Sequence, residues 1–308
     1  MKELDISVEA PKIIEKIQYF IETHIKEREA DGVLIWFSGY IDSTIIAKLS
    51  FEAIGTENVK LFMRYDKFIN GREEILSNSI EFLGIDEEGI EKCDIEQIIR
   101  KFGSDELIRG SIREIPSLYE PLSYPLLKST AKNEIEGKTY GMVGKASSGR
   151  EEIIHKIIAR NKLRSRIQMA SSYLIAETEN RLLVGTINKT ELLTGLFTKW
   201  GHGHCTDLMP LGNLFRTQIL QLADYLKVPE SISDLAKADL LPGIQNKYLY
   251  FFDLFAYDVD RILFRLESGS SITDISNETG LPIDKIEKVN FFFCSSAYTR
   301  AAPLIPKM

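Results

Sequence analysis

The sequence predicts an α/β fold, a doubly wound parallel sheet flanked by helices. An apolar run from Val33 to Phe37, bounded by Gly32 and Ser38, is typical of a strand buried on both faces of a parallel sheet. Strand-like and helix-like segments then alternate along the chain, an order that implies parallel strands joined by right-handed crossovers. The length of 308 residues allows an ample core. We expect one domain over residues 1–308.

Each element is predicted from its own pattern. Residues 7–30 interleave apolar positions with Lys and Glu, which indicates an amphipathic helix. Apolar residues recur at helical spacing from Ile41 onward, and a helix over 71–83 ends at Gly84, a C-cap residue. Similar patterns predict the other elements: strands at 58–65, 90–95 and 182–186, and helices at 151–178 and 213–226.

Two segments depart from this alternation. Residues 103–150 contain several prolines and glycines and show no sustained period, so we expect an irregular surface insertion, typical of a lid or an interface element. Residues 257–308 form a C-terminal helical segment. Within it, residues 271–289 read as two short helices joined by a turn with Gly280, the outline of a helix-turn-helix.

Composition excludes several classes of protein. A net charge of −7 argues against general affinity for nucleic acid, and the second helix of the 271–289 pair carries Asp284 and Glu287, which suit a DNA groove poorly. Three scattered cysteines indicate a reducing compartment. Without a signal-peptide pattern, or an apolar run of the roughly 18 residues that a membrane span needs, we expect a cytoplasmic protein with no membrane partner.

The turn that follows the first strand is the first candidate site. It reads Ser38-Gly39-Tyr40-Ile41-Asp42-Ser43 and lies between a predicted strand and a predicted helix. Such a turn places backbone N–H groups at the positive end of a helix dipole, where anions bind. In a nucleotide enzyme that anion is usually phosphate or pyrophosphate. A plain βα turn capped by serine is the alternative.

This turn resembles the pyrophosphate loop of the ATP pyrophosphatase superfamily, Ser-Gly-Gly-x-Asp-Ser, with Tyr40 in place of the second glycine. Residues 181–217 resemble the signature of NAD synthetase: Val-Gly-Thr at 184–186, Asn-Lys-Thr-Glu at 188–191, Phe-Thr-Lys-Trp-Gly at 197–201, and Pro-Leu at 210–211. Residues 164–169 and 238–243 resemble two further segments of that family. The motifs occur in the family's order and cover most of the chain except 103–150.

The resemblance implies an adenine nucleotide alpha hydrolase-like, Rossmann-like fold and an ammonia-dependent NAD synthetase. Such an enzyme uses ATP to adenylate the carboxylate of deamido-NAD, releases pyrophosphate, and lets ammonia displace AMP. The family forms homodimers, and the helices near 7–25 and 151–178 are candidates for that interface. Because no glutaminase segment precedes the core, we expect free ammonia or a separate ammonia-supplying partner.

Candidate site residues follow from the same resemblance. The metal ligands for Mg²⁺ are Asp42 and Glu191, and the catalytic residues are Asp42, Lys199 and Arg216. The substrate-binding residues are His202, Asp207 and Arg300. The ATP-binding residues are Ser38, Gly39, Tyr40, Asp42, Ser43, Arg166, Thr186, Lys199 and Arg216.

Three departures from the family keep other interpretations open. Tyr40 adds bulk where the chain approaches phosphate, and His202 replaces an aspartate. Ala297–Arg300 stands where the family has a histidine-lysine-arginine stretch that closes over the dinucleotide, and only Arg300 of that stretch remains. The alternatives are a related amide ligase for another carboxylic acid and a paralogue without catalysis. A helix-turn-helix DNA-binding protein is the remote one.

Overall fold

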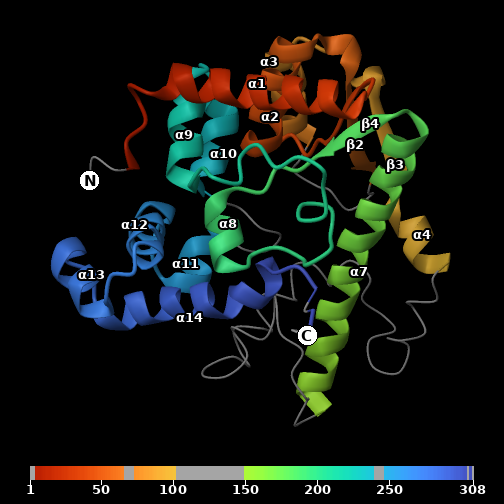
Figure 1. Cartoon of the computed structure of the whole chain (residues 1–308). Helices are drawn as coiled ribbons and strands as arrows, with labels where there is room; N and C mark the ends of the chain where they lie inside the picture. Colours follow the sequence, from red (N-terminus) through yellow and green to blue (C-terminus); the bar gives the residue numbers. More distant parts are fainter. Residues whose placement is uncertain (1–3, 66–72, 102–148, 239–245, 304, 307–308) are drawn as a thin grey trace.

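The computed structural model describes residues 4–65, 73–101, 149–238, 246–303 and 305–306. Its centre is a four-stranded parallel sheet in the order β3-β2-β1-β4, with helices on both faces (Figure 1). The strands are β1 (Gly32–Trp36), β2 (Val59–Tyr65), β3 (Ile90–Asp94) and β4 (Arg181–Val184). The predicted doubly wound α/β fold is confirmed.

The helices alternate with the strands and then continue without them toward the C-terminus. The first group is α1 (Ala10–Arg28), α2 (Ile41–Ile54), α3 (Glu73–Leu83), α4 (Ile95–Lys101), α7 (Gly149–Thr178), α8 (Lys189–Thr194), α9 (Arg216–Tyr225) and α10 (Glu230–Ala238). The second is α11 (Lys247–Phe252), α12 (Ala256–Glu267), α13 (Ile272–Thr279) and α14 (Ile283–Arg300). Short 3₁₀ turns precede β2 (Thr56–Asn58) and β3 (Glu87–Gly89).

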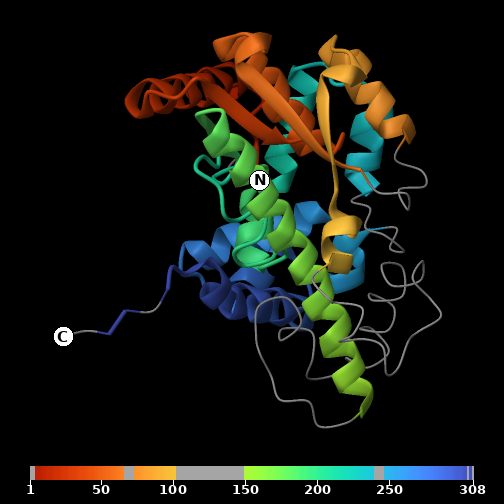
Figure 2. The same ribbon diagram turned by 90° about the vertical axis from the view of Figure 1, so that its right-hand side faces the viewer.

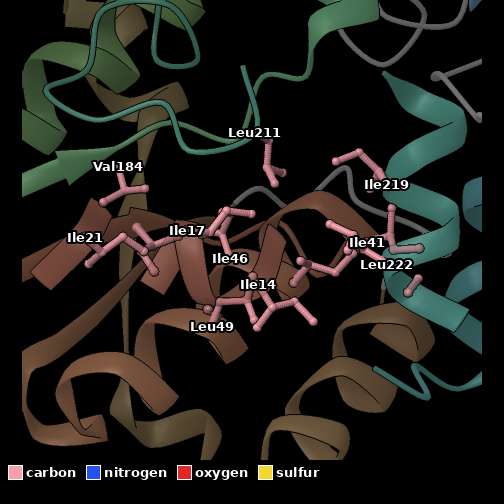
Figure 3. Close-up of a cluster of buried hydrophobic side chains, with 14 of the residues drawn as sticks. Ile14, Ile17, Ile21, Ile41, Ile46, Leu49, Val184, Leu211, Ile219 and Leu222 are labelled. Carbon is pink, nitrogen blue, oxygen red and sulfur yellow. The ribbon is translucent and has the colours of Figure 1, made fainter. Parts of the chain in front are cut away.

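Alternate residues of the strands point to opposite faces of the sheet and build two cores. On one face Val33 and Ile35 pack with side chains of α1, α2 and α9. Figure 3 shows this core, with Ile14 and Ile21 of α1 and Ile46 of α2 among its side chains. On the other face the neighbouring strand residues pack with Ile95 and Ile99 of α4 and Ile167 of α7. Burial on both faces explains why β1 is apolar at every position.

The C-terminal helices form a third core of their own. It contains aromatic and aliphatic residues of α11, α12, α13 and α14, together with Leu193 of α8 and Phe215 at the start of α9. The 271–289 pair belongs to this core, since Ile275, Ile286 and Val289 are fully buried. The apolar side of each helix therefore packs inside the domain, and α14 is an 18-residue helix rather than the short second helix of the predicted pair.

Some element boundaries differ from the predicted ones for local reasons. The predicted strand 182–186 ends at Val184 because the Gly185 N–H donates to Leu208 O at 2.8 Å, which takes the chain away from β1. The helix predicted from residue 213 begins at Arg216, because the Gln218 side chain accepts from Phe215 N at 2.9 Å and caps the helix there. Gly84 ends α3 with φ of +66°, as predicted.

The order of the strands indicates where this sheet is expected to bind a ligand. The chain moves outward from β1 to β2 and β3, and then returns through α7 to β4 on the opposite side of β1. The carboxyl ends of β1 and β4 therefore flank a topological switch point, where open α/β sheets bind ligands. The turn at residues 38–43 follows β1 at this edge, as predicted.

The long helix α7 runs past the end of the sheet (Figure 2). The predicted irregular insertion at 103–150 lies outside the described residues except for its last two positions, which begin α7. In the described part of the chain, no helix is long and apolar enough to cross a membrane.

Candidate active site

The turn after β1 is held in shape by its two serines. The Ser43 hydroxyl donates to Tyr40 O at 2.9 Å and accepts from Ser38 N at 3.2 Å. The Ser38 and Ser43 hydroxyl oxygens are 3.0 Å apart, and Ser38 Oγ also accepts from Tyr40 N at 3.3 Å. These hydrogen bonds close the turn on itself and leave the first residues of α2 facing the carboxyl end of the sheet.

Glycine is required at position 39 and not at position 40. Gly39 has φ of +76°, a Cβ there would lie 3.1 Å from Leu76 Cα, and its carbonyl accepts from Ser79 Oγ at 2.6 Å. Tyr40 has φ of −75° and ψ of 161°, an extended conformation open to any residue. Replacing the second glycine of the loop pattern with tyrosine therefore adds a half-buried side chain but no backbone strain.

The N-terminus of α2 is the anion-binding element of this turn. The amides of Ile41, Asp42 and Ser43 have no carbonyl one helical turn earlier to accept from them. Together with the helix dipole they form a positive end suited to phosphate oxygens. Asp42 is the acidic residue in this first turn.

A second helix begins at the same edge, in the loop after β4. Asn188 is the N-cap of α8: its side chain accepts from Glu191 N at 3.0 Å, and the Glu191 carboxylate accepts from Asn188 N at 3.4 Å. The Asn188 amide also donates to Asp42 Oδ1 at 3.1 Å. Asn188, which is fully buried, therefore joins the first turns of α2 and α8 across the switch point.

Each of the two candidate metal carboxylates is paired with a cation from the C-terminal half of the chain. Arg216 Nη1 lies 2.7 Å from Asp42 Oδ2, and Lys247 Nζ lies 2.8 Å from Glu191 Oε1. The side chains are only partly accessible to solvent, with 5% of Arg216 and 19% of Asp42 exposed. The result is a charged row in the order Lys247–Glu191–Asn188–Asp42–Arg216, with an ion pair on each side of the neutral amide.

A buried carboxylate fixes the spacing of the helices that carry this row. Asp260 of α12 is fully buried and accepts from Thr190 Oγ1 at 2.5 Å. It also accepts from Thr217 N and Thr217 Oγ1, both at 2.8 Å. Thr190 Oγ1 in turn accepts from Arg216 N at 2.8 Å. Asp260 thus binds the residues next to Glu191 and Arg216.

Three other predicted residues lie around the loop that follows α8. Lys199 Nζ donates to Tyr298 O at 2.8 Å and lies 4.2 Å from the centre of the Tyr298 ring. Arg166 donates to Lys199 O at 3.4 Å. His202 Nδ1 lies 3.0 Å from Ser165 Oγ, and the centre of the His202 ring lies 5.3 Å from the centre of the Trp36 ring. Thr186 is half-buried just past the end of β4.

The last two predicted substrate residues are bound to the protein's own backbone. Asp207 accepts from Leu183 N at 2.7 Å and from the Tyr173 hydroxyl at 3.2 Å, and burial together with this carboxylate raises the pKa of Tyr173. Arg300 donates to Leu192 O at 3.4 Å and Leu193 O at 3.1 Å. Asp207 therefore holds the edge of β4, and Arg300 caps the C-terminus of α8.

The two carboxylates fit a magnesium site that is shared with phosphate. Mg²⁺ commonly takes one or two carboxylates and completes its shell with water and phosphate oxygens. Asp42 and Glu191 both contact Asn188, on two different sides of it. Within the described ranges no group of three or more His, Cys, Asp or Glu residues could hold a metal by itself. The donor set therefore suits an ion that arrives with a phosphate ligand.

Sequence reasoning missed three members of this arrangement. Asn188 belongs to the quoted Asn-Lys-Thr-Glu segment and carries the signal of a helix cap, Asn followed three residues later by Glu. Lys247 and Asp260 carry no such signal. They are 56 and 70 residues away from their partners Glu191 and Thr190, and only the packing of the C-terminal helices brings them in.

We expect Asp260→Asn to destabilise the protein. The NH₂ group of asparagine takes the place of a carboxylate oxygen that accepts from buried donors, and it cannot accept a hydrogen bond. Each buried donor left without an acceptor costs about 1–3 kcal/mol. The free energy of unfolding from urea titration measures this loss. Asp258→Asn is the matched control on the same helix, because its partly exposed pair with Arg261 contributes about 0–1 kcal/mol. Equal stability of the two variants would contradict the role given to Asp260.

Comparison with known proteins identifies the family. The family model described as NAD synthase matches residues 13–114 and 122–303, and so includes most of the 103–150 segment that the motifs did not cover. The chain is 30% identical over 296 residues to the NH(3)-dependent NAD(+) synthetase of Thermotoga maritima, covering 94% of this chain and 98% of the relative. It is 28% identical to that of Methanocaldococcus jannaschii, covering 96% and 97%.

Solved structures agree on the fold. The NH3-dependent NAD synthetase of Campylobacter jejuni superposes with a TM-score of 0.65 at 21% identity, covering 97% of this chain and 99% of that one. The NMN synthetase of Francisella tularensis superposes with a TM-score of 0.64 at 19% identity and the same coverage. The fold, the site at the switch point and the match over most of the chain lead to one conclusion: the chain belongs to the NAD synthase family.

Proposed function

We propose that this protein is an ATP-dependent ligase that converts deamido-NAD to NAD with ammonia. In this reaction a carboxylate oxygen attacks the α-phosphorus of ATP, the bond to pyrophosphate breaks, and an acyl-adenylate forms. Ammonia then attacks the acyl carbon, AMP leaves, and loss of a proton gives the carboxamide. Membership of the NAD synthase family supports the reaction class. The NH(3)-dependent relatives support ammonia as the nitrogen donor.

The observation that carries the proposal is the meeting of the two helix N-termini at the switch point. The first-turn amides of α2 suit the pyrophosphate, and Arg216 lies beside Asp42 at the same place. Arginine presents a planar fork that can bind two phosphate oxygens, unlike the compact ammonium of lysine. Charge stabilisation of the leaving group by preorganised donors is commonly the largest catalytic contribution.

We further propose that Asp42 and Glu191 hold Mg²⁺. When bound, the ion would neutralise charge on the leaving pyrophosphate. Ser38, Gly39, Tyr40 and Ser43 shape the loop around the phosphates, while Arg166, Thr186 and Lys199 remain predicted contacts of ATP. His202, Asp207 and Arg300 remain predicted contacts of the substrate. For Asp207 and Arg300 such a contact would compete with the backbone hydrogen bonds that they make in this structure.

A different carboxylic acid is the second candidate for the substrate. Two of the three departures from the family pattern, His202 and the residues near Tyr298, lie on the side attributed to the dinucleotide. The similarity in fold to an NMN synthetase adds a specific acid to test, deamido-NMN. The reaction class is the same for both candidates, so one assay with two acids can separate them.

We expect the purified protein to form NAD from deamido-NAD, ammonium, ATP and Mg²⁺. AMP release and direct detection of NAD measure the reaction, with an assay lacking deamido-NAD as the control. AMP release and amide formation only with deamido-NMN would move the assignment to the second candidate. If the protein bound no ATP with either acid present, both candidate substrates would be ruled out.

We expect Asp42→Asn and Glu191→Gln each to lower kcat/KM by about 100-fold or more. A neutral side chain cannot stabilise the metal that offsets charge on the leaving group, and loss of one such interaction in the transition state commonly costs 10²–10³-fold. Steady-state kinetics, with thermal unfolding as a check of the fold, measures the effect. Asp258→Asn, on a surface ion pair of α12, is the control. Wild-type turnover in both site variants would place the metal elsewhere.

We also propose a homodimer, with α1 and α7 as the candidate interface. The inner face of α1 is used inside its own chain, since Ile14, Ile17 and Ile21 are buried. Outward-facing apolar side chains remain on both helices, where Tyr19 is 70% exposed and Leu174 is 69% exposed. Sedimentation of the protein at micromolar concentration should therefore give twice the mass of the chain. Sedimentation as a monomer would refute this proposal.

A further inference from the structure

Lys247 is a cation at the candidate metal site that none of the sequence motifs contains. It is the first residue of α11, in the C-terminal half of the domain. Its Nζ lies 2.8 Å from Glu191 Oε1, and only 12% of its side chain is exposed. Its partner Glu191 is 22% exposed, so the pair is sheltered from solvent and screened less by salt than a surface pair.

Helix stability does not account for a lysine at this position. A cation in the first turn lies at the positive end of the helix dipole, where it is unfavourable. The N-cap of α11 is already supplied by Asn246, whose side chain accepts from Leu249 N at 2.9 Å. The ammonium is held instead by the side chains around it: the Glu191 carboxylate lies 2.8 Å from Nζ, and the centre of the Tyr248 ring lies 5.0 Å from it.

This contact affects how a divalent ion can reach Glu191. One carboxylate oxygen of Glu191 is held by Lys247, and the other accepts from Asn188 N at 3.4 Å. A divalent ion that binds Glu191 without an accompanying anion has to approach a fixed ammonium of like charge. Phosphate oxygens that arrive with the ion offer the ammonium a new acceptor and remove this obstacle.

At the opposite end of the charged row, the other carboxylate is also paired with a cation. Asp42 is held by Arg216 at 2.7 Å, as Glu191 is held by Lys247. The four charged side chains of the row, two carboxylates and two cations, sum to no net charge, so each carboxylate attracts the ion alone less than it would without its paired cation. An ion bound to a polyphosphate brings negative charge that both cations can contact.

We propose that Lys247 is a positioning residue that occupies Glu191 until Mg²⁺ arrives with the nucleotide, so that ion and nucleotide bind together. The inference rests on the proposed function in one respect, the assignment of Glu191 as a metal ligand. It does not depend on which acid is amidated. Coupling of this kind is reciprocal: the nucleotide strengthens ion binding by the same factor as the ion strengthens nucleotide binding.

The test measures binding of Mn²⁺, a probe for Mg²⁺, by electron paramagnetic resonance without any acid substrate. Titrations are done with and without the α,β-methylene analogue of ATP, which cannot release pyrophosphate. We expect Lys247→Met to bind Mn²⁺ alone at least about tenfold more tightly than wild type, the size of one charged hydrogen bond removed. With the analogue present, Lys247→Met and wild type should bind Mn²⁺ equally well. The factor by which the analogue tightens Mn²⁺ binding is therefore smaller in the variant than in wild type.

Three controls isolate the Lys247–Glu191 contact. Lys247→Arg keeps a cation beside Glu191 and should bind Mn²⁺ like wild type. The double variant Lys247→Met with Glu191→Gln should lose the gain, because the ligand that the lysine covers is gone. Lys285→Met removes a lysine paired with Asp253 elsewhere in the same core region and should leave Mn²⁺ binding unchanged. Thermal unfolding verifies each fold, and Lys247→Gln replaces the methionine variant if that one fails to fold.

Equal affinity of Mn²⁺ for wild type and Lys247→Met in the absence of nucleotide would overturn the inference. So would a gain that persists in the Glu191→Gln background. Absence of Mn²⁺ binding by wild type even with the analogue would remove Glu191 as a metal ligand, and the inference with it. Failure to form NAD would overturn the proposed substrate but leave the Mn²⁺ titrations and their conclusion standing, so the two failures are distinguishable.

Discussion

Asp42 is the residue at which three distant segments of the chain meet. One carboxylate oxygen accepts from Asn188 in the loop after β4, and the other is paired with Arg216 at the start of α9. Removing charges from water is costly, and a sheltered ion pair often adds little net stability. The pair therefore contributes little to the stability of the fold by itself, which agrees with the proposed role of Asp42 in holding a metal ion.

The C-terminal helices are part of this site rather than an appendage to the sheet. An acid in the first turn of a helix is common, because the helix dipole favours it, and Asp42 and Glu191 could each be explained in that way. What sets them apart is that each also holds a cation from far along the sequence, Arg216 or Lys247. Asp260 of α12 then fixes the helices that carry Arg216 and Glu191.

Local patterns in the sequence were enough to predict the sheet and the turn, because the features involved are local. An apolar run marks β1, and the small residues Ser38, Gly39 and Ser43 between that run and a helical pattern mark the turn, where Gly39 has φ of +76°. Asp42 and Arg216 are 174 residues apart, and no spacing rule connects them. Their association was predicted only through resemblance to a family, and Lys247 was missed because it belongs to none of the motifs. Packing of the third core, which no local pattern encodes, brings it to Glu191.

One departure from the family pattern, Tyr40, and one residue that matches it, Arg300, lie on the two sides of the site. Tyr40 lies on extended backbone, so the turn keeps the shape that presents the α2 amides to an anion. Arg300, at the end of α14, donates to the last carbonyls of α8, where a cation complements the helix dipole. Because α8 also carries Glu191, the end of α14 and the candidate metal ligand are linked through one short helix.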